Sequence, residues 1–360
     1  MPSQGENGSL STNVSVWPTI TPLPLAKNLL GKVALILCGL LLSLSVLELG
    51  LRTYASLASQ ERLLIADSIL GWKLVPNAKR LYRREVKPYF VAINSKGLRD
   101  REHSYDKRAD VYRIVVIGDS MVFGAGGVEA SERFTDILER STKNLEVINM
   151  GIPAFGTDQE YLYLQNEGLK YHPDLVIICA FSNDYGESFS IINPGIGRPK
   201  GYFSLSAGQL VFHPPTFSGF YQLAQYSYVL GLADFALTKI SGVYRKARRQ
   251  WHAVLDPPTR LQVFKQLYAS SGDLCRQQGS ELLLVYFPLP GQNTKWIIQQ
   301  VMDELAATEG IKTLDLMDTM RRANAARPAY FEHDIHFNEY GHQVVAEALL
   351  EYLVNSKLLK

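Results

Sequence analysis

Four separate stretches of the chain carry side-chain types that are used in nucleophilic catalysis. Gly118-Asp119-Ser120 brings a hydroxyl, residues 149–159 bring glycines and amides, 181–184 bring an amide and a carboxyl, and 333–342 bring histidines and carboxyls. A serine hydroxyl becomes a good nucleophile only beside a general base, and the oxyanion that it generates needs preorganised N–H donors. Together these types could support acyl transfer through a serine.

The elements between these stretches predict how they could meet. The apolar run Ile114–Ile117 has the pattern of a strand buried on both faces, as in a parallel sheet. The sequence predicts strands at 113–118, 146–149, 175–181, 281–287 and 313–316. It predicts helices at about 131–142, 157–170, 259–278, 294–308 and 340–355. This alternation predicts a three-layer α/β/α fold with a parallel sheet covered on both faces.

In such a sheet the first three stretches follow strands and therefore share its carboxyl edge, where open α/β sheets bind ligands. The fourth stretch precedes the last predicted helix, and its loop can return to that edge. Structural interpretations stay open for each residue: Ser120 as a helix N-cap, Asn183 as a turn cap, and Asp119 and Asp184 as supports of their loops. His333 and His342 compete with His336 as the base.

The four stretches, in this order and spacing, resemble the SGNH hydrolases, the GDSL-type esterase and lipase family. The resemblance covers roughly residues 110–360. Each block alone is a weak signal, whereas all four in order are a strong one. The resemblance implies a flavodoxin-like sheet and an enzyme that acts on ester bonds. The preceding segments Gly71-Trp72 and Asn94–Arg99 look like extensions of membrane-anchored bacterial members.

Matched residue by residue, the resemblance implies that Ser120 is the nucleophile, His336 is the base and Asp334 orients the imidazole. It implies that the oxyanion hole consists of the backbone N–H groups of Ser120 and Gly156 and the side-chain amide of Asn183. It implies no metal and no organic cofactor. The expected substrate is an ester of a saccharide or a lipid.

Two positions depart from the family pattern. The family's acid usually lies three residues before the histidine, but position 333 is histidine and Asp334 lies two before His336. This shorter spacing resembles the branch related to alginate O-acetyltransferases, so transfer of the acyl group to a polysaccharide is an alternative to hydrolysis. Phe181 stands where the third block usually has glycine. A non-catalytic binding protein with this fold is a third alternative.

The amino-terminal part predicts a membrane anchor. Residues 1–27 are polar and read as a disordered tail, and 28–52 contain the Leu-rich run 33–51, which has one charge, Glu48, and just spans a hydrocarbon core. The alternatives are a buried helix or a cleaved signal peptide. The favoured hypothesis is a single-pass anchor with residues 53–360 outside the cytoplasm.

The rest divides into an amino-terminal extension, 53–108, and a hydrolase domain, 109–360, with an insertion at about 186–258. The extension predicts short strands packed beside the main domain. The insertion predicts a hairpin over 201–212 and a helical apolar stretch from Tyr221 to Leu237. A basic run follows, read either as a solvated helix end or as a patch that faces anionic lipid or an acidic polymer: Lys239, Arg245, Lys246, Arg248 and Arg249.

Composition sets outer limits on these hypotheses. The 360 residues are 46% hydrophobic and 20% charged, as in ordinary globular proteins. A net charge of +2 gives no argument for nucleic acid as a partner. The positions of Cys38, Cys179 and Cys275 favour free thiols over a disulfide and lack metal-ligand spacing.

Overall fold

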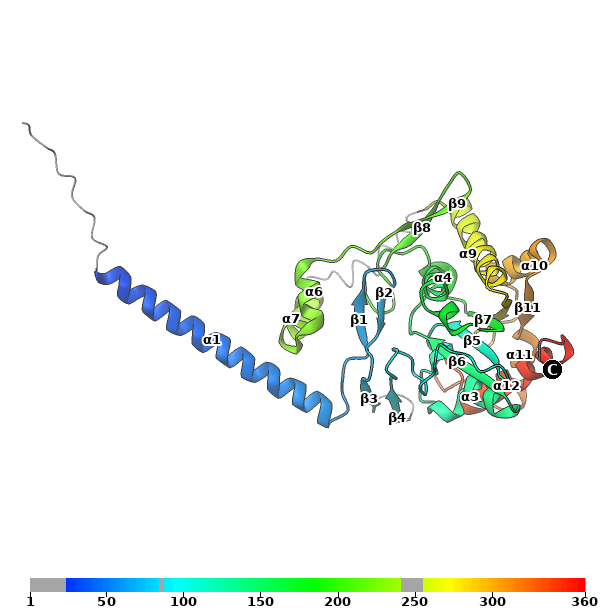
Figure 1. Cartoon of the computed structure of the whole chain (residues 1–360), viewed down its shortest axis with the longest axis horizontal. Helices are drawn as coiled ribbons and strands as arrows, with labels where there is room; N and C mark the ends of the chain where they lie inside the picture. Colours follow the sequence, from blue (N-terminus) through cyan, green and yellow to red (C-terminus); the bar gives the residue numbers. More distant parts are fainter. Residues whose placement is uncertain (1–23, 84–86, 241–254, 360) are drawn as a thin grey trace, which may run out of the picture. The chain divides into compact units, whose positions relative to one another are not determined.

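The computed structural model of the chain describes residues 24–83, 87–240 and 255–359 (Figure 1). It divides into two units, Met1–Gly50 and Leu51–Lys360. The second unit is built on a five-stranded parallel sheet with the strand order β11-β10-β7-β5-β6. Its strands are β5 (Tyr112–Gly118), β6 (Leu145–Gly151), β7 (Leu175–Ala180), β10 (Glu281–Tyr286) and β11 (Lys312–Asp315).

The strand order places a topological switch point beside β5. The chain goes from β5 to its neighbour β6 on one side, then crosses back to β7 on the other side. This is the flavodoxin-like order, in which ligands bind at the carboxyl ends of the strands flanking the switch. Ser120 follows β5 and therefore lies at this position.

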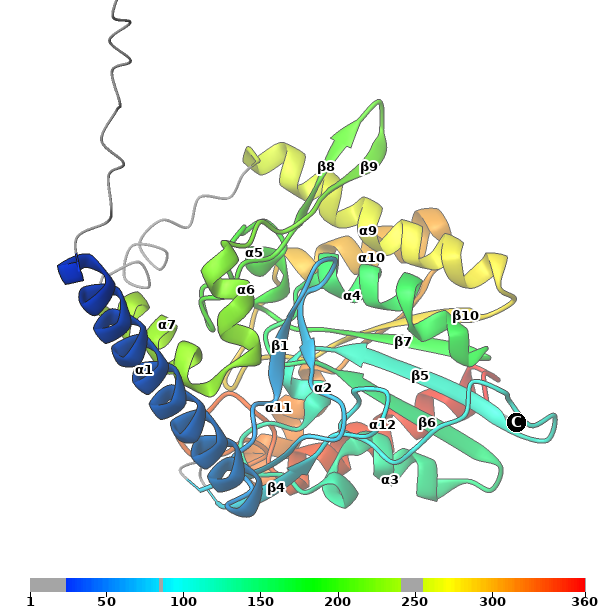
Figure 2. The same ribbon diagram turned by 60° about the vertical axis from the view of Figure 1, so that its left-hand side comes forward.

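Helices cover both faces of the sheet, as Figure 2 shows. Side chains alternate along β5: Val115 and Ile117 belong to one apolar cluster, and Ile114 and Val116 to the other. Residues of α4 (Thr157–Asn166), α9 (Pro257–Gln277) and α10 (Ile297–Glu309) fill the first cluster. Residues of α3 (Phe134–Ser141), α11 (Met317–Ala326) and α12 (Glu339–Asn355) fill the second. The three-layer α/β/α fold is thereby confirmed.

The five predicted strands occur within one or two residues of their expected bounds, but the helices differ in two ways. The helix expected at 131–142 is interrupted by extended backbone at Arg133, so a short 3-10 helix, η1 (Ala130–Glu132), precedes α3. The helix expected at 157–170 likewise ends at Asn166 and is followed by η2 (Gly168–Tyr171). Helix α11 (Met317–Ala326), in which half of the residues are polar and the buried side chains are Met320 and Ala323, was not predicted.

The extension forms two small antiparallel hairpins. They consist of β1 (Leu64–Asp67) with β2 (Gly71–Leu74), and of β3 (Lys79–Tyr82) with β4 (Tyr89–Ala92). Trp72 is fully buried in the same apolar cluster as one face of the central sheet, edge-on to Phe155. The extension therefore contributes to the core beneath the sheet's carboxyl edge.

A short helix, α5 (Asp184–Glu187), leads into the insertion. The insertion contains the expected hairpin of β8 (Tyr202–Ser206) with β9 (Gln209–His213), and two apolar helices. These helices are α6 (Gly219–Tyr226) and α7 (Tyr228–Ile240). The basic run falls outside the described side chains. Cys179 and Cys275 are buried thiols and Cys38 is an exposed one.

One long helix, α1 (Pro24–Leu57), precedes the extension. Its residues Leu29–Leu57 have a mean hydropathy of 2.3 in the most apolar window and are exposed throughout that window. Length and composition fit a membrane-crossing helix, and a signal sequence near the amino terminus would meet the same criteria. The helix begins before and ends after the predicted 28–52 segment, and residues 1–23 of the predicted tail lie outside the described residues.

Candidate active site

Ser120 is positioned by a tight turn from β5 into a short helix, α2 (Ser120–Phe123). The Asp119 carboxylate caps this helix and accepts a hydrogen bond from the Met121 N–H at 2.8 Å. A Cβ on Gly118 would lie 2.4 Å from the Val122 side chain, so the turn requires glycine there. The serine hydroxyl is thus presented at the carboxyl end of the strand.

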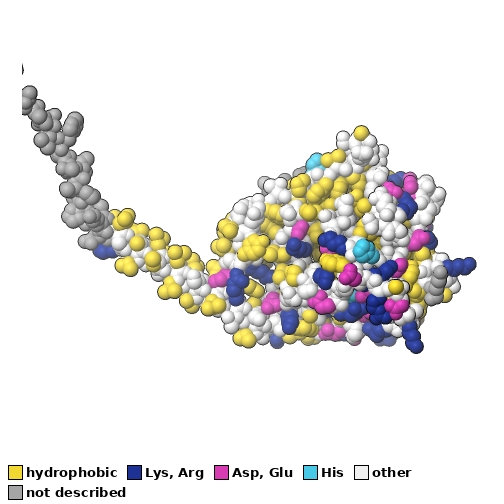
Figure 3. Space-filling model, viewed as in Figure 1, with side chains coloured by type: hydrophobic (Ala, Val, Ile, Leu, Met, Phe, Trp, Pro, Cys, Tyr) yellow, Lys and Arg dark blue, Asp and Glu magenta, His cyan; other side chains and the backbone are white. Residues whose placement is uncertain are grey.

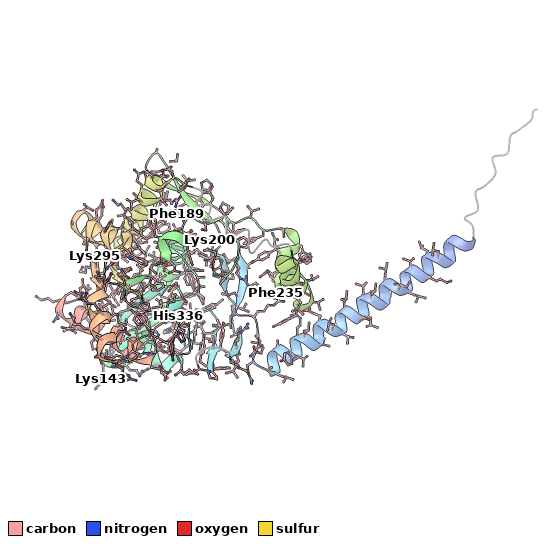
Figure 4. The ribbon with its side chains drawn as sticks, turned by 180° about the vertical axis from the view of Figure 1, so that it is seen from behind. Lys143, Phe189, Lys200, Phe235, Lys295 and His336 are labelled. Atoms are coloured by element: carbon pink, nitrogen blue, oxygen red, sulfur yellow. The ribbon has the colours of Figure 1, made fainter. Side chains whose placement is uncertain are left out.

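His336 reaches Ser120 from a loop 216 residues further along the chain. The loop is closed by a bridge between Tyr330 and Phe337 and by a hydrogen bond from the Phe331 N–H to the His336 carbonyl. His336 lies within the body of the second unit in Figure 4. Its Nε2 lies 2.8 Å from the Ser120 Oγ. This distance suits proton transfer from the hydroxyl to the imidazole.

Asp334 contacts the other ring nitrogen of His336. Its Oδ1 lies 2.6 Å from Nδ1 and also accepts the backbone N–H of His336 at 3.0 Å. The hydrogen bond to His336 lowers the pKa of Asp334 to about 2, against desolvation that opposes it. An ionised Asp334 holds the Nδ1 proton and leaves Nε2 free to accept. With only one residue between them, the Asp334 carboxylate still reaches the His336 ring because it turns back toward the backbone N–H of His336.

The two other histidines of this segment have different surroundings. The His333 side chain is 90% exposed and lies beside Glu332. His342 is buried on α12, where its Nδ1 accepts the Phe134 N–H at 3.2 Å. Burial, with a smaller effect from Arg133, lowers the pKa of His342 to about 3, so this ring is neutral at physiological pH. Neither ring has a described hydrogen bond to Ser120.

Asn183 lies next to the serine turn through Asp119. Its Nδ2 donates to the Asp119 Oδ2 at 3.4 Å, and the Ser120 Oγ lies 3.5 Å from the same oxygen. Both distances are at the long limit for hydrogen bonds, so these contacts are weak and a stronger acceptor could replace Asp119. Burial raises the pKa of Asp119, against the hydrogen bonds from Met121 and Asn183 that lower it.

Gly156 is the N-cap of α4 and is not in direct contact with the serine turn among the described interactions. Its N–H donates to the Gln159 Oε1 at 3.3 Å, and a Cβ there would lie 3.0 Å from the backbone nitrogen of Ser188. Gly156 therefore packs against α5, the helix that begins just after Asn183. No described contact joins Gly156 to Ser120, and its N–H is engaged by Gln159.

Phe181 and Asp184 hold the third loop together. The Phe181 N–H donates to the Asp184 Oδ2 at 2.6 Å, and the Phe181 ring is buried in the α3–α11–α12 cluster. A side chain is therefore accommodated where the family pattern has glycine. Asp184 is fully buried and stabilises the loop backbone, as its structural interpretation predicted.

A group of buried carboxyls lies behind the serine turn. Lys200 is the cation at its centre: its Nζ donates to the Asp158 Oδ1 at 2.7 Å and to the Glu187 carbonyl at 2.8 Å. Figure 4 labels Lys200. Glu160 accepts no hydrogen bond from the described residues, and burial with the neighbouring Asp119 and Asp158 charges raises its pKa well above the usual range. Burial raises the pKa of Glu187 to about 7.

Two further residues, which sequence reasoning did not assign to the site, support the serine helix. Arg99 of the extension is 2% exposed, and its Nη1 donates to the carbonyls of Phe123 and Gly124 at 2.8 Å each. Asn149, at the end of β6, donates from Nδ2 to the Val122 carbonyl at 2.7 Å. They satisfy carbonyls that the end of a four-residue helix would leave unpaired.

The extension also contacts the loop after β6. The Trp72 Nε1 donates to the Pro153 carbonyl at 3.1 Å, and the Gln159 Nε2 donates to the Leu70 carbonyl at 2.6 Å. The β1–β2 hairpin therefore fixes the loop that leads to Gly156. The sequence predicted short strands packed beside the main domain but not this partner.

A groove of about 700 Å³ runs along the loop that carries Asp334. Its walls include Pro290, Tyr330, Phe331 and the exposed Ile335. The volume is in the range of small-molecule sites. Among the described residues, no group of three or more His, Cys, Asp or Glu side chains is arranged to hold a metal ion.

Comparison with known proteins identifies the family. The profile of the GDSL-like lipase/acylhydrolase family matches residues 116–344, which is more than half of the chain. The chain belongs to the GDSL-like lipase/acylhydrolase family. It is accordingly an enzyme of the GDSL, or SGNH, ester hydrolase type. A comparison with curated protein sequences gives no match.

Several solved structures of GDSL proteins are similar to this chain at low sequence identity. A lipase/acylhydrolase from Enterococcus faecalis is 15% identical, with a TM-score of 0.40 over 68% of this chain and 95% of that one. A member of the lipolytic protein G-D-S-L family from Veillonella parvula is 14% identical, with a TM-score of 0.40 over 66% and 96%. A catalytic mutant of Axe2, an acetylxylan esterase from Geobacillus stearothermophilus, is 15% identical, with a TM-score of 0.39 over 67% and 93%.

Proposed function

We propose that this GDSL hydrolase is a membrane-anchored serine esterase that uses Ser120, His336 and Asp334 as its catalytic triad. The observation that carries the proposal is the continuous chain of contacts from the Ser120 Oγ to the His336 Nε2 at 2.8 Å and from the His336 Nδ1 to the Asp334 Oδ1 at 2.6 Å. The hydrolase domain proposed here covers residues 109–360, with the insertion at about 186–258.

In the proposed reaction, the Ser120 oxygen attacks the ester carbonyl while His336 takes the hydroxyl proton at Nε2. The imidazolium then gives this proton to the leaving alcohol as the C–O bond breaks, which leaves an acyl group on Ser120. Water deprotonated by the same Nε2 attacks the acyl carbonyl and releases the acid. Asp334, with its lowered pKa, remains ionised throughout and stabilises the imidazolium.

The proposed oxyanion hole consists of the Ser120 N–H, the Gly156 N–H and the Asn183 Nδ2. In the substrate-free arrangement, Gly156 and Asn183 make long hydrogen bonds of 3.3 and 3.4 Å to Gln159 and Asp119. An oxyanion is a stronger acceptor than either partner, so both donors would leave these bonds as Ser120 attacks and the oxyanion forms. Removing one such donor typically costs a factor of about 10² to 10³ in kcat.

The proposal places the catalytic domain on the outer side of a membrane, held by α1. Support comes from the 29 residues Leu29–Leu57, which are long and apolar enough to cross a hydrocarbon core. The test is protease digestion of intact cells. Degradation of the carboxyl-terminal domain is expected, and full protection in intact but not in lysed cells would contradict the orientation. Amino-terminal sequencing of the mature protein separates an anchor from a cleaved signal.

The proposed substrates are carboxylic esters of saccharides or lipids. The Asp334-x-His336 spacing, which resembles the acyltransferase branch, favours one second candidate: transfer of the acyl group to a saccharide hydroxyl. Product analysis with and without a saccharide acceptor separates the two candidates, because hydrolysis releases the free acid in both cases. An acylated saccharide as the main product would identify a transferase.

The direct test of the proposed triad is the Ser120→Ala variant, assayed on p-nitrophenyl esters of increasing acyl length. Turnover should fall to the background of the uncatalysed reaction, and the wild-type series should report the acyl preference. The neighbouring Ser182→Ala, in the loop after β7, is the matched control and should retain activity. Unchanged turnover by Ser120→Ala would refute the assignment.

A further inference from the structure

The two apolar helices of the insertion expose hydrophobic side chains that belong to neither core cluster. In the α6–α7 hairpin, defined here as Gly219–Ile240, Leu223 is 63% exposed, Tyr226 70%, Leu232 58% and Leu237 57%. Figure 3 shows hydrophobic side chains gathered on this part of the surface. Soluble monomers rarely expose apolar surface of this kind, so the hairpin is expected to bind a membrane or another protein through these side chains.

The hairpin is attached to the chain segment that directly follows the apolar run of α1. Arg52, which belongs to the second unit, donates to the Tyr226 carbonyl, and Arg62 donates to the Ala224 carbonyl at 2.8 Å and the Ser227 carbonyl at 2.7 Å. These carbonyls lie at the carboxyl end of α6, where the helix carries partial negative charge. The Ser227 carbonyl also accepts the Gly231 N–H of α7 at 3.0 Å. Arg52 and Arg62 therefore link the end of α6 to the chain segment that follows the apolar run.

This attachment determines how far the hairpin is from the bilayer if α1 is an anchor. The apolar run 33–51 is roughly 28 Å long as a helix, the thickness of a hydrocarbon core. Arg52 follows it immediately, at the level where arginine side chains reach the membrane–water interface. The Tyr226 carbonyl, held by Arg52, must lie within one arginine side chain of that interface.

We propose that the α6–α7 hairpin is a second membrane contact, which inserts its exposed leucine side chains into the interfacial region of the same bilayer that holds α1. This inference rests on the anchor in the proposed function. Interfacial helices bury an apolar face roughly 5–10 Å deep at the boundary of headgroups and acyl chains. A span and an adjoining interfacial hairpin together would fix the orientation of the catalytic domain relative to the bilayer. A span alone would let the domain rotate about its attachment point.

The sequence after the hairpin has the charge that an anionic bilayer attracts. Lys239 lies at the end of the hairpin, and Arg245, Lys246, Arg248 and Arg249 follow within nine residues of Ile240; these side chains lie outside the described residues. Basic residues beside a membrane surface gain attraction to anionic lipids that falls with added salt. We therefore name phospholipid, with an anionic fraction, as the partner of this surface.

The test uses the full-length chain in vesicles of phosphatidylethanolamine and phosphatidylglycerol, with single spin labels on introduced cysteines. The background carries Cys38→Ser, since Cys179 and Cys275 are buried. Labels replace Leu223 and Leu232 in the hairpin, and Leu41 in α1. The control label replaces Val354 on α12, an exposed apolar position whose end of the molecule lies away from α6 and α7 (Figure 1).

The readout compares collision of each label with oxygen, which concentrates in lipid, and with a nickel chelate, which stays in water. The inference predicts an oxygen-to-nickel accessibility ratio at Leu223 and Leu232 several-fold above that at Val354. Ratios equal to Val354, with Leu41 buried in lipid, would overturn this inference and leave the anchor standing. Exclusion of both reagents at Leu223 and Leu232 would show a protein cover, such as a second copy, and would also overturn it.

The Leu41 label reports on the anchor separately. A water-accessible Leu41 would overturn the anchor in the proposed function, whatever the hairpin labels show. Since none of the labelled positions contacts Ser120 or His336, esterase activity of each labelled protein serves as the check that it is folded.

Discussion

Replacing Glu187 with glutamine should make the stability of this protein less dependent on pH. Glu187 is 7% exposed at the end of α5, and its Oε2 accepts a hydrogen bond from the Asn193 Nδ2 at 2.9 Å. Burial raises its pKa from 4.5 to about 7. At about 1.4 kcal/mol per pH unit, the gap between these values corresponds to about 3.5 kcal/mol of unfolding free energy, of which about 3 kcal/mol develops between pH 4.5 and pH 8.

The sign follows from where the proton is held. Between pH 4.5 and 7 the folded protein keeps the Glu187 proton and the unfolded chain releases it. The stability from the protonated group is therefore fully present below pH 4.5 and is lost as the pH rises through 7. Glutamine is neutral at every pH, has nearly the same shape and can still accept the Asn193 bond. Glu187→Gln should match the wild type at pH 4.5 and exceed its unfolding free energy by about 3 kcal/mol at pH 8.

The assay is urea denaturation of the full chain in detergent at pH 4.5, 6 and 8, followed by circular dichroism. The matched control is Glu351→Gln on the exposed side of α12, which should leave the difference near zero at each pH. The comparison is a difference between variants, so titration of groups distant from Glu187 cancels. A constant difference between Glu187→Gln and the wild type across this range would refute the argument that burial disfavours the charged form of Glu187.

Three other variants test the site itself. Asp334→Asn should lower kcat roughly 10⁴-fold on a p-nitrophenyl ester, because an amide cannot hold the Nδ1 proton of His336 in the required tautomer; a loss below tenfold would contradict this role. Asn183→Ala should lower kcat about 10²- to 10³-fold with KM little changed, and a rise in KM alone would instead indicate substrate binding. Arg99→Met should lower the unfolding free energy by about 2–4 kcal/mol, since it leaves the Phe123 and Gly124 carbonyls without their charged donor; equal urea midpoints would show that the helix needs no such support.

The fold could be predicted from the sequence because each core strand coincides with a short, continuous run of apolar residues. The β-branched apolar run before Gly118 favours a buried strand, and each remaining core strand is similarly apolar. The helices were predicted less well. Helix α11 buries only Met320 and Ala323, too few apolar positions to distinguish a core-facing helix from a polar loop. At the break, the buried Arg133 guanidinium donates to the Arg99 carbonyl, a contact with the extension that no local pattern shows.

The candidate catalytic residues could be assigned from motifs, whereas their supports could not. Arg99 looks like a surface residue in a polar turn, yet its partners lie 24 and 25 residues further along the chain. Glu160 lies on a predicted helix, where a charged side chain usually faces solvent, and only the packing of α4 against the sheet buries it. Burial and long-range carbonyl contacts depend on the assembled fold, and a single sequence does not encode them in any local pattern.

The most direct test of the central claim is covalent labelling by a fluorophosphonate probe, followed by mass spectrometry of the peptides. The account predicts one adduct, on the Ser120 Oγ, which is absent in Ser120→Ala and strongly slowed in His336→Ala. A matched His342→Ala variant should retain labelling wherever it remains folded, because that ring accepts a backbone N–H and has no described contact with the serine. An adduct on another serine, or labelling of Ser120 that is as fast without the His336 imidazole, would contradict the proposed triad.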